Sequence, residues 1–436
     1  MQTTDGSNPV WMSSAEAAAR LGVSLPTLYS YVSRGWLHPQ PATVAAHADG
    51  AVATQGESGA KSAKGASRAK LYRRGEVERL ARRNDTAHEP RRATQAALSF
   101  GLPVLESSLC LIEDGRYYYR GIDAVEMAAT ATLEDVAALL WNCDEQALRR
   151  QDNMQACPRP PDDTLPMPQR MRLHFEALAS RWALLDVPAG DHGAHWPLVQ
   201  VMMLAATGRS PQPVSAPSHA HLHEQLAAAW SLSAAAAGEL RRALVLVADH
   251  ELNVSSFTAR CVASTGVDAA AALVAALAAL SGPRHGAMSI DVEALWPQFE
   301  SESHDAARLE RWLDDRRARI PGFGHALYPD GDPRAQALLA RLPRQSARDR
   351  LVQAVQRRSG QAPNLDYALT ALTRELAAPP GAAFALLAIG RSVGWLAHVF
   401  EQQALGMLIR PRAAYVGALP QRSLPQAPMG RVIRRR

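Results

Sequence analysis

The chain has 436 residues, of which 47% are hydrophobic and 20% are charged, so it can bury a large core and is not a disordered protein. Lysine occurs only at Lys61, Lys64 and Lys70. This argues against a Schiff base, pyridoxal phosphate or a Walker-type phosphate site, because each needs a lysine in a folded site. The net charge of +5 lies entirely in residues 1–96, with 13 Lys+Arg and 8 Asp+Glu, because the remainder is balanced.

Residues 11–37 predict two short helices joined by a tight turn. Ser13 and Glu16 have the spacing of a capping box, in which each side chain accepts a hydrogen bond from the backbone of the other residue. Gly22 suits the turn, and Ser24 followed by Pro26 is typical of the start of a second helix. Two short helices around such a turn form the helix-turn-helix pattern.

Residues 71–83 predict a short strand followed by a helix, whereas residues 41–70 are rich in Ala, Gly, Ser and Thr and predict a flexible loop. The segments AAARLGVSLPTLYSYVSRGWL (17–37) and YRRGEVERL (72–80) resemble the small winged helix-turn-helix domain of MerR-type regulators and excisionases. In this comparison the loop interrupts the wing. We therefore assign residues 1–83 to a helix-turn-helix-like domain with an insertion.

This resemblance implies DNA as a partner through residues 11–83. The excess positive charge favours DNA binding, and so do the polar residues expected on the second helix, Thr27, Tyr29, Ser30 and Arg34. Few arginines are available for phosphates, so a single copy would bind weakly. The alternative interpretation is a helical appendage that packs on the body of the protein or on a partner chain.

Residues 84–97 predict a polar linker, and patterns of helical period begin at about residue 98. Alternating strand patterns are scarce beyond this point, apart from residues 110–119, where Glu113, Asp114 and Gly115 predict the turn of a small hairpin. The body is therefore predicted to be all-α. Apolar residues recur at three- and four-residue spacing in four segments: 133–141, 226–251, 269–280 and 384–403.

The sequence predicts a cytoplasmic protein without a membrane segment. Its first residues lack the basic and apolar segments of a signal peptide. The apolar stretch 269–280 is about half the length of a membrane span, and the stretch 382–400 is interrupted by Arg391. No CxxC spacing occurs, which favours a reducing compartment over a disulfide framework or a zinc ribbon, and the cysteines are Cys110, Cys143, Cys157 and Cys261.

Four segments combine polar side chains with residues that favour turns. A histidine in a rigid turn is a common way to present an imidazole to a substrate, although each histidine taken singly fits a structural role as well. The segments are 248–256 with His250, 281–286 with His285, 320–325 with His325 followed by 332–334 with Arg334, and 363–367 with Asp366.

Together these segments resemble the citrate synthase family over most of residues 105–420. That family joins the acetyl group of acetyl-CoA to oxaloacetate, giving citrate and CoA. The resemblance implies an all-helical homodimer with a large domain, 98–286 and 378–436, and a small domain, 287–377. The blocks that carry it are YYRGIDAVEMA (118–128), VADHELNVSSFTARCVAST (247–265), LSGPRHGAM (280–288), IPGFGHALYPDGDPRA (320–335), PNLDY (363–367), AIGRSVGWLAHVFEQ (388–402) and IRPRAAYVG (409–417).

The resemblance implies three catalytic residues. Asp366 corresponds to the base that removes a proton from the weakly acidic thioester methyl group. His285 corresponds to the histidine that hydrogen-bonds the thioester oxygen, where the enolate charge develops. His325 corresponds to the histidine that polarises the ketone of oxaloacetate and protonates the new hydroxyl.

Oxaloacetate has two carboxylates, and arginine suits their bidentate recognition. The resemblance implies oxaloacetate binding by Arg334, Arg391 and Arg410, with a further contact from His250. Arg410 would come from the neighbouring subunit. No metal and no bound cofactor are implied, and acetyl-CoA is a co-substrate. The segment HisAlaHisLeuHis at 219–223 is expected to be an exposed polar turn rather than a metal site.

The chain departs from the family's pattern near the expected CoA phosphates. Ala287 and Met288 stand where the family usually has Gly and Ala followed by Asn. The family also usually has GlyHisArg and then Tyr-Lys where this chain has GlyHisAlaLeuTyrPro at 324–329, so the expected Arg and Lys are missing. The CoA contacts are therefore unknown. The alternatives are a 2-methylcitrate synthase, which takes propionyl-CoA, a citryl-CoA lyase, or a DNA-binding regulator whose body senses a metabolite without turnover.

Overall fold

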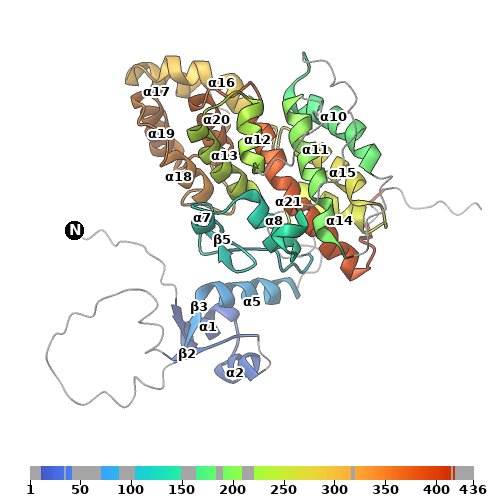
Figure 1. The fold of residues 1–436 in the computed structure, drawn as a ribbon. Coiled ribbons are helices and arrows are strands. Elements are labelled where there is room, and N and C mark those ends of the chain that lie inside the picture. The colour runs from blue at the N-terminus through green and yellow to red at the C-terminus, as the bar shows by residue number, and fades with distance from the viewer. Residues whose placement is uncertain are drawn as a thin grey trace, which may run out of the picture.

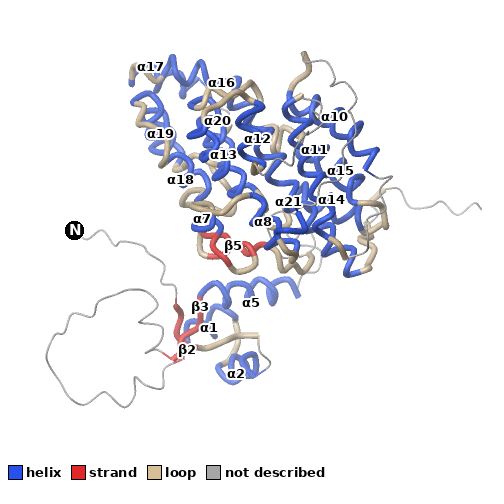
Figure 2. The backbone as a smooth tube through the Cα atoms, viewed as in Figure 1, coloured by secondary structure: helices blue, strands red, loops and turns tan. Residues whose placement is uncertain are grey.

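A computed structural model provides the fold (Figure 1). It describes residues 11–33, 36–41, 70–87, 104–148, 164–182, 190–208, 220–315, 320–413 and 416–417. Helices dominate this part of the chain, and the strands are short (Figure 2). The mostly helical character predicted from the sequence is confirmed, with two small sheets added to it.

The N-terminal part contains the predicted pair of short helices, α1 (Ser14–Leu21) and α2 (Leu25–Ser33). Ser13 and Glu16 form the predicted capping box, and Gly22 closes α1 in the left-handed conformation with φ 65°. A three-stranded antiparallel sheet in the order β1-β3-β2 lies beside them. Its strands are β1 (Trp11–Ser13), β2 (Gln40–Pro41) and β3 (Lys70–Arg73), and α5 (Arg74–Ala87) follows.

This N-terminal unit has a hydrophobic core of its own. Leu28 of α2, Tyr72 of β3 and Val77 of α5 are fully buried. The loop expected at 41–70 includes one residue too many at each end, because Pro41 belongs to β2 and Lys70 belongs to β3. The linker expected from residue 84 was also placed too early, because α5 continues to Ala87. Arg34, expected on the polar face of α2, lies outside the described residues.

The predicted hairpin of the body is present. Strands β4 (Cys110–Glu113) and β5 (Arg116–Tyr119) pair in antiparallel register, and β6 (Ile122–Asp123), which was not predicted, extends the sheet. Tyr117 and Tyr119 are fully buried and donate hydrogen bonds to the carbonyl oxygens of Leu246 and Val245, at 3.0 and 2.9 Å. These bonds fasten the sheet to the end of the helix that precedes His250.

The larger core lies among the helices of the body (Figure 1). At its centre is α21 (Ala382–Leu405), which is buried over most of its length. The other helices of this region are α7 (Ala124–Met127), α8 (Leu133–Trp141), α9 (Glu145–Leu148), α10 (Met167–Trp182), the 3₁₀ turn η1 (His192–His195), α11 (Trp196–Thr207), α12 (Leu222–Ala229), α13 (Ala234–Val247), α14 (Val254–Ala263) and α15 (Ala269–Leu280).

Two glycines allow α21 to approach the end of α13 closely. A Cβ atom at Gly390 would lie 2.4 Å from Val247 Cγ2, and one at Gly394 would lie 2.3 Å from the Ala248 carbonyl oxygen. The Gly394 N–H donates to that same oxygen at 3.0 Å. Close packing here places the α13–α14 turn, with His250, directly against α21.

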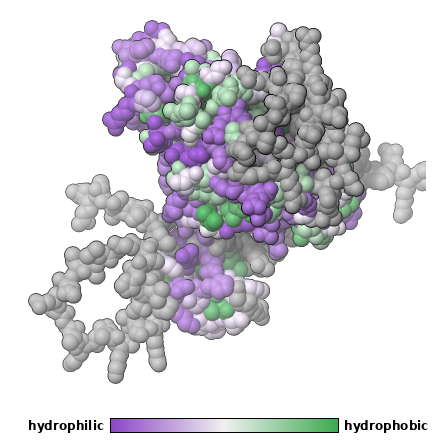
Figure 3. Space-filling model, viewed as in Figure 1, coloured by the Kyte–Doolittle hydropathy of each residue, from purple (hydrophilic) through white to green (hydrophobic). Residues whose placement is uncertain are grey.

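A second core forms among α16 (Met288–Glu302), α17 (Ala306–Asp315), α19 (Ser346–Ser359) and part of α20 (Leu365–Glu375). The short helix α18 (Pro333–Leu339) packs with the larger core instead. In Figure 3, hydrophilic residues predominate over α17 and α19. Helix α20 contributes Leu369 to the larger core and Tyr367 to the second, so it joins the two. The domain boundaries at 287 and 377 stay a prediction.

The structure corrects two expectations about helices. The segment 226–251 is two helices, because Ser231 adopts a left-handed conformation with φ 58° and Ser233 caps α13. The segment expected to be an exposed turn is described only over 220–223, where α12 begins at Leu222 and His223 is buried; His219 lies outside the described residues. No group of three or more His, Cys, Asp or Glu residues in the described ranges could hold a metal ion.

Helix α21 is long and apolar enough to cross a membrane by length and composition alone. The apolar window of this helix is entirely buried within the protein, as in the core helix of a soluble protein. The cytoplasmic location stays a prediction.

Candidate active site

His250 lies in the turn between α13 and α14, where it is buried and contacts a residue far along the chain. Its Nε2 is 2.9 Å from the hydroxyl of Tyr328. Burial, and then the nearby charge of Arg334, lower the pKa of His250 well below its usual range. The ring is therefore neutral at physiological pH and can exchange only hydrogen bonds with a ligand.

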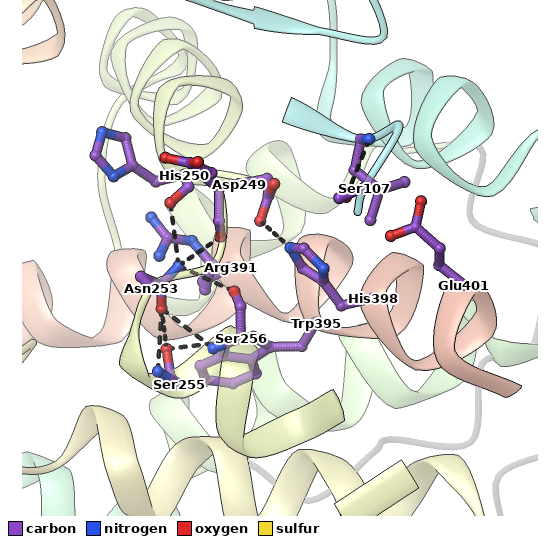
Figure 4. A network of polar contacts seen from close by, with 12 residues as sticks. Ser107, Asp249, His250, Asn253, Ser255, Ser256, Arg391, Trp395, His398 and Glu401 are labelled. Carbon is purple, nitrogen blue, oxygen red and sulfur yellow. Dashed lines mark hydrogen bonds and ion pairs between the residues drawn. The ribbon is translucent and has the colours of Figure 1, made fainter. Parts of the chain in front are cut away.

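The same turn positions His285 through Ser255 (Figure 4). Asn253 caps α14 by accepting from the backbone N–H groups of Ser255 and Ser256, each at 3.1 Å. The Ser255 hydroxyl lies 2.7 Å from Asn253 Oδ1 and 2.9 Å from His285 Nε2, and it accepts from Trp395 Nε1 at 3.1 Å. As placed, the hydroxyl donates its single proton to Asn253 Oδ1. Rotation of this hydroxyl can turn the proton to His285, and the neutral ring then carries its own proton on Nδ1 and can donate it to a substrate oxygen.

The pKa of His285 is lowered to about 4 by burial, and then by the charge of Arg391. A neutral imidazole is a weaker acid than an imidazolium. It can stabilise a developing enolate by donating a hydrogen bond while remaining unionised at pH 7.

His325 ends a glycine-containing loop that is tied to the segment before α20. Its Nδ1 accepts from the Leu327 N–H at 3.2 Å, so the neutral ring carries its proton on Nε2. Gly324, with φ 77°, donates its N–H to the Ala362 carbonyl at 2.8 Å. The His325 ring meets that of His250 edge to face, with centroids 5.4 Å apart. The loop thus fixes both the tautomer and the position of this histidine.

Asp366 lies in the first turn of α20, next to the same loop. Asn364 caps this helix by accepting from the N–H groups of Asp366 and Tyr367, at 3.0 and 3.3 Å, and its own N–H donates to the Gly322 carbonyl at 2.9 Å. Burial raises the pKa of Asp366 to about 7, against the opposing charge of Arg334. A carboxyl group with such a pKa is a stronger base than an ordinary aspartate at neutral pH.

Arg334 is held rigidly by Asp332, a residue that was not among the predicted site residues. Its Nε and Nη2 donate to the two carboxylate oxygens of Asp332, at 2.9 and 2.7 Å, and both side chains are buried. Its guanidinium also lies near the rings of Tyr117 and Tyr328, 6.0 and 5.6 Å from their centroids. Burial opposes the charged form of Arg334, but Asp332 outweighs it and raises the pKa of the arginine.

Arg391 is buried on α21 beside the turn that holds His250. Its Nε donates to the Val247 carbonyl at 2.8 Å, and no other described residue takes a hydrogen bond from its two terminal nitrogens, so these can bind a ligand carboxylate. Burial lowers the pKa of Arg391, and Asp249 opposes this effect. The structure therefore gathers six of the seven predicted residues, His250, His285, His325, Arg334, Asp366 and Arg391, around the junction of the two cores.

Arg410 is the exception, because this chain does not bring it to the same place. It is exposed, and the N–H of the preceding Ile409 donates to Ser264 at the C-terminal end of α14. Ser255, which contacts His285, lies at the opposite end of that helix. A helix of 10 residues is about 15 Å long, so Arg410 is remote from the other six within one chain.

A cavity of about 480 Å³ lies beside the candidate site, and none of the seven predicted site residues lines it. Helix α16 supplies its largely apolar side and the glycine-containing loop supplies the other. The lining residues are Met288, Asp291, Ala294, Leu295, Pro321, Gly322, Phe323 and Asn364. Since Asn364 caps the helix of Asp366, the cavity leads toward the proposed base.

The sequence profile described as "Citrate synthase, C-terminal domain" matches residues 98–412. A protein named putative citrate synthase 2, from Mycobacterium tuberculosis, is 38% identical over 189 residues, covering 41% of this chain and 50% of that protein. The 2-methylcitrate synthase 1 of Corynebacterium glutamicum is 32% identical over 197 residues, covering 43% and 51%. The chain thus spans about half the length of the first curated relatives that it matches.

Longer matches also occur. The citrate synthase of Mycolicibacterium smegmatis is 30% identical over 359 residues, covering 70% of this chain and 90% of that protein. The crystal structure of citrate synthase from Thermotoga maritima has a TM-score of 0.59 and 26% identity, and the match covers 74% of this chain and 96% of that one.

Proposed function

Because the chain belongs to the citrate synthase family, we propose that it condenses acetyl-CoA with oxaloacetate to give citrate and CoA. The observation that carries this proposal is the grouping of Asp366, His285 and His325 with the buried cations Arg334 and Arg391. A sensor of dicarboxylates needs the arginines, but it has no need of a carboxylate base with a raised pKa.

The proposed reaction begins at the thioester methyl group. The Asp366 carboxylate takes one proton, the C–H bond breaks, and His285 donates a hydrogen bond to the enolate oxygen. The enolate carbon then forms a C–C bond with the ketone carbon of oxaloacetate. The ketone oxygen takes the Nε2 proton of His325, and the proton that Asp366 removed restores the ring. Water then cleaves the citryl thioester to citrate and CoA.

Oxaloacetate is the better supported of the two substrates. Arg334 and Arg391 are buried cations beside the neutral rings of His250 and His285, so a dicarboxylate would neutralise charge that is already desolvated. In contrast, Ala326 and its neighbours supply no cation where the family meets the CoA phosphates. Propionyl-CoA, the substrate of a 2-methylcitrate synthase, and the reverse chemistry of a citryl-CoA lyase are the alternatives.

Thiol release from acetyl-CoA tests the proposal when it is measured with and without oxaloacetate. We expect thiol release that depends on oxaloacetate and is lost in Asp366→Asn, because the amide keeps the shape of the side chain but cannot take a proton. Removal of a general base costs about 10²–10⁴-fold. Propionyl-CoA and citryl-CoA are tested in parallel. A protein that binds oxaloacetate but releases no thiol from any of these compounds would be a sensor rather than an enzyme.

We also propose a homodimer in which Arg410 completes the site of the partner subunit. The exposed position of Arg410, remote from the other six residues of its own chain, supports this arrangement. Mixing inactive Arg410→Ala with inactive Asp366→Asn protein should restore part of the activity, because one site of the mixed dimer then has both intact residues. No recovery on mixing, after subunit exchange has been verified, would contradict a shared site.

A second proposal concerns residues 11–83, which we infer to bind DNA. The support is the separate core of this unit and the exposed face of α2, where Tyr29 is 46% exposed and Lys70 lies 5.7 Å above its ring. Retention of a fluorescent 30-base-pair duplex by the full chain, but not by a chain beginning at Ser99, is the expected result. Binding should weaken steeply with salt, because phosphate contacts release counterions. Equal retention by both chains would overturn the proposal.

A further inference from the structure

A buried carboxylate and a buried imidazole lie behind the candidate active site. Asp249 Oδ1 and His398 Nε2 are 3.3 Å apart, and both side chains are completely inaccessible to solvent. Figure 4 shows the two groups directed at each other, with Arg391 on the same helix as His398. None of the proposed catalytic steps uses Asp249 or His398.

Their placement connects both residues to the site. Asp249 directly precedes His250, and His398 follows Arg391 by two turns of α21, so both of these helix residues face the α13–α14 turn. The Asp249 carboxylate fits against α21 because Gly394, which has no side chain, lies between Arg391 and His398 on that helix. A Cβ atom at Gly394 would lie 2.6 Å from Asp249 Oδ1.

Burying the Asp249–His398 pair in the core is expected to lower the stability of the fold. Among the described residues, no side-chain polar atom of Asp249 or His398 has a hydrogen-bond partner of good geometry. Burying a carboxylate with incomplete pairing costs free energy, and apolar residues of similar volume would usually serve stability as well or better. Such a cost is expected where a charge has a function in a neighbouring site.

That neighbouring charge is Arg391. Asp249 is the strongest electrostatic partner of this guanidinium, whose only hydrogen bond within the described ranges is the one from Nε to Val247. A cation in this position needs a fixed counter-charge on the side away from the substrate. Without such a counter-charge, the buried guanidinium is poorly stabilised when the site is empty, and its orientation toward the substrate is poorly fixed when the site is filled.

We propose that Asp249 and His398 form a positioning pair that fixes the guanidinium of Arg391 for a carboxylate of the dicarboxylate substrate. In this arrangement His398 Nε2 lies 3.3 Å from Asp249 Oδ1 as its electrostatic partner, and Asp249 in turn stabilises the charge of Arg391. The proposal rests on the proposed function in one respect, namely that Arg391 binds oxaloacetate. Neither residue of the pair touches the substrate.

The test compares three variants with a matched control. His398→Leu removes the donor, whereas His398→Gln keeps an N–H group that can reach Asp249. Asp249→Asn keeps the shape and removes the charge. The control is His174→Leu, because His174 is also buried but lies on α10, which packs mainly against α11 and α15 and less against α21. The ring of His174 contacts the backbone of Ala205 on α11 rather than α21. Oxaloacetate affinity is measured by calorimetry, and kcat and both KM values by thiol release.

We expect His398→Leu and Asp249→Asn to weaken oxaloacetate binding about tenfold, the effect of losing one charge-assisted interaction. The KM for acetyl-CoA and the kcat at saturating oxaloacetate should change by less than about threefold. His398→Gln should recover most of the affinity, and His174→Leu should keep all of it. This pattern separates positioning from a general loss of stability, which would affect both substrates.

Unchanged oxaloacetate affinity in soluble, folded His398→Leu and Asp249→Asn proteins would overturn the proposal. Failure of His398→Gln to recover affinity would do the same. If Asp249→Asn proves insoluble, the His398→Leu and His398→Gln pair still decides the matter. A wild-type chain that binds no oxaloacetate would instead refute the proposed function, and calorimetry reveals this independently of turnover.

Discussion

The raised pKa of Asp366 leads to a specific pH dependence of catalysis. Burial sets this pKa at about 7, so about one-tenth of the molecules carry the ionised base at pH 6 and about nine-tenths at pH 8. Because only the ionised carboxylate can take a proton, kcat/KM for acetyl-CoA should rise about tenfold between these two pH values. An aspartate with the ordinary pKa of 3.8 would be ionised throughout and would give a flat profile.

The histidine nearest to the thioester does not interfere over this range. The pKa of His285 is about 4, so that ring stays neutral between pH 6 and pH 8. The assay is initial thiol release at saturating oxaloacetate and at acetyl-CoA concentrations below KM, with oxaloacetate affinity measured by calorimetry at each pH. A flat rate profile together with constant affinity would refute the assignment of Asp366 as a base with a raised pKa.

The same pKa predicts a change in stability. Between pH 3.8, where the unfolded carboxyl ionises, and pH 7, the folded chain keeps a proton that the unfolded chain has lost. The contribution of Asp366 to the free energy of unfolding therefore falls as pH rises through this window. Asp366→Asn has no such group, so it should gain stability relative to wild type between pH 5 and pH 8 in denaturant melts. An unchanged difference across these pH values would contradict the shifted pKa.

Three further outcomes are expected. Gly394→Ala should lower the free energy of unfolding by about 1–3 kcal/mol in denaturant melts, because its Cβ would meet the Ala248 carbonyl oxygen at 2.3 Å. The control Gly238→Ala, on an open helix face, should raise the free energy of unfolding by about 0.5–1 kcal/mol. Arg391→Ala should raise the KM for oxaloacetate at least about tenfold, and an unchanged KM would place the carboxylate site elsewhere. A chain beginning at Ser99 should keep thiol-release activity within a small factor of the full chain, and a folded but inactive product would make the N-terminal unit part of the enzyme.

Local chemistry determined much of what could be predicted. The capping box of Ser13 and Glu16, the left-handed Gly22 and the hairpin at 110–119 each depend on residues only a few positions apart, and each is confirmed. Helix α8 begins and ends at the predicted residues, 133 and 141. The order of the seven blocks also indicated the family before any contact was known.

Other features depend on contacts between distant segments. A hydropathy pattern could not show the break at Ser231, because the apolar period continues through it. It could not show that His223 is buried, or that Tyr328 reaches His250 across 78 positions of the chain. Burial and packing decide these outcomes, and neither is a property of a short segment.

The sequence by itself determined which side chains were candidates for the site: it named His285, Asp366 and Arg391 from their motifs. Only the tertiary structure decided the state in which each is held, because a pKa depends on burial and on neighbouring charges rather than on residue type. It alone buried the neighbouring Asp332 and Arg334 together, and it alone placed Asp249 against His398. Such pairing arises when helices pack closely and exclude water, so that each buried charge must find its partner within the protein.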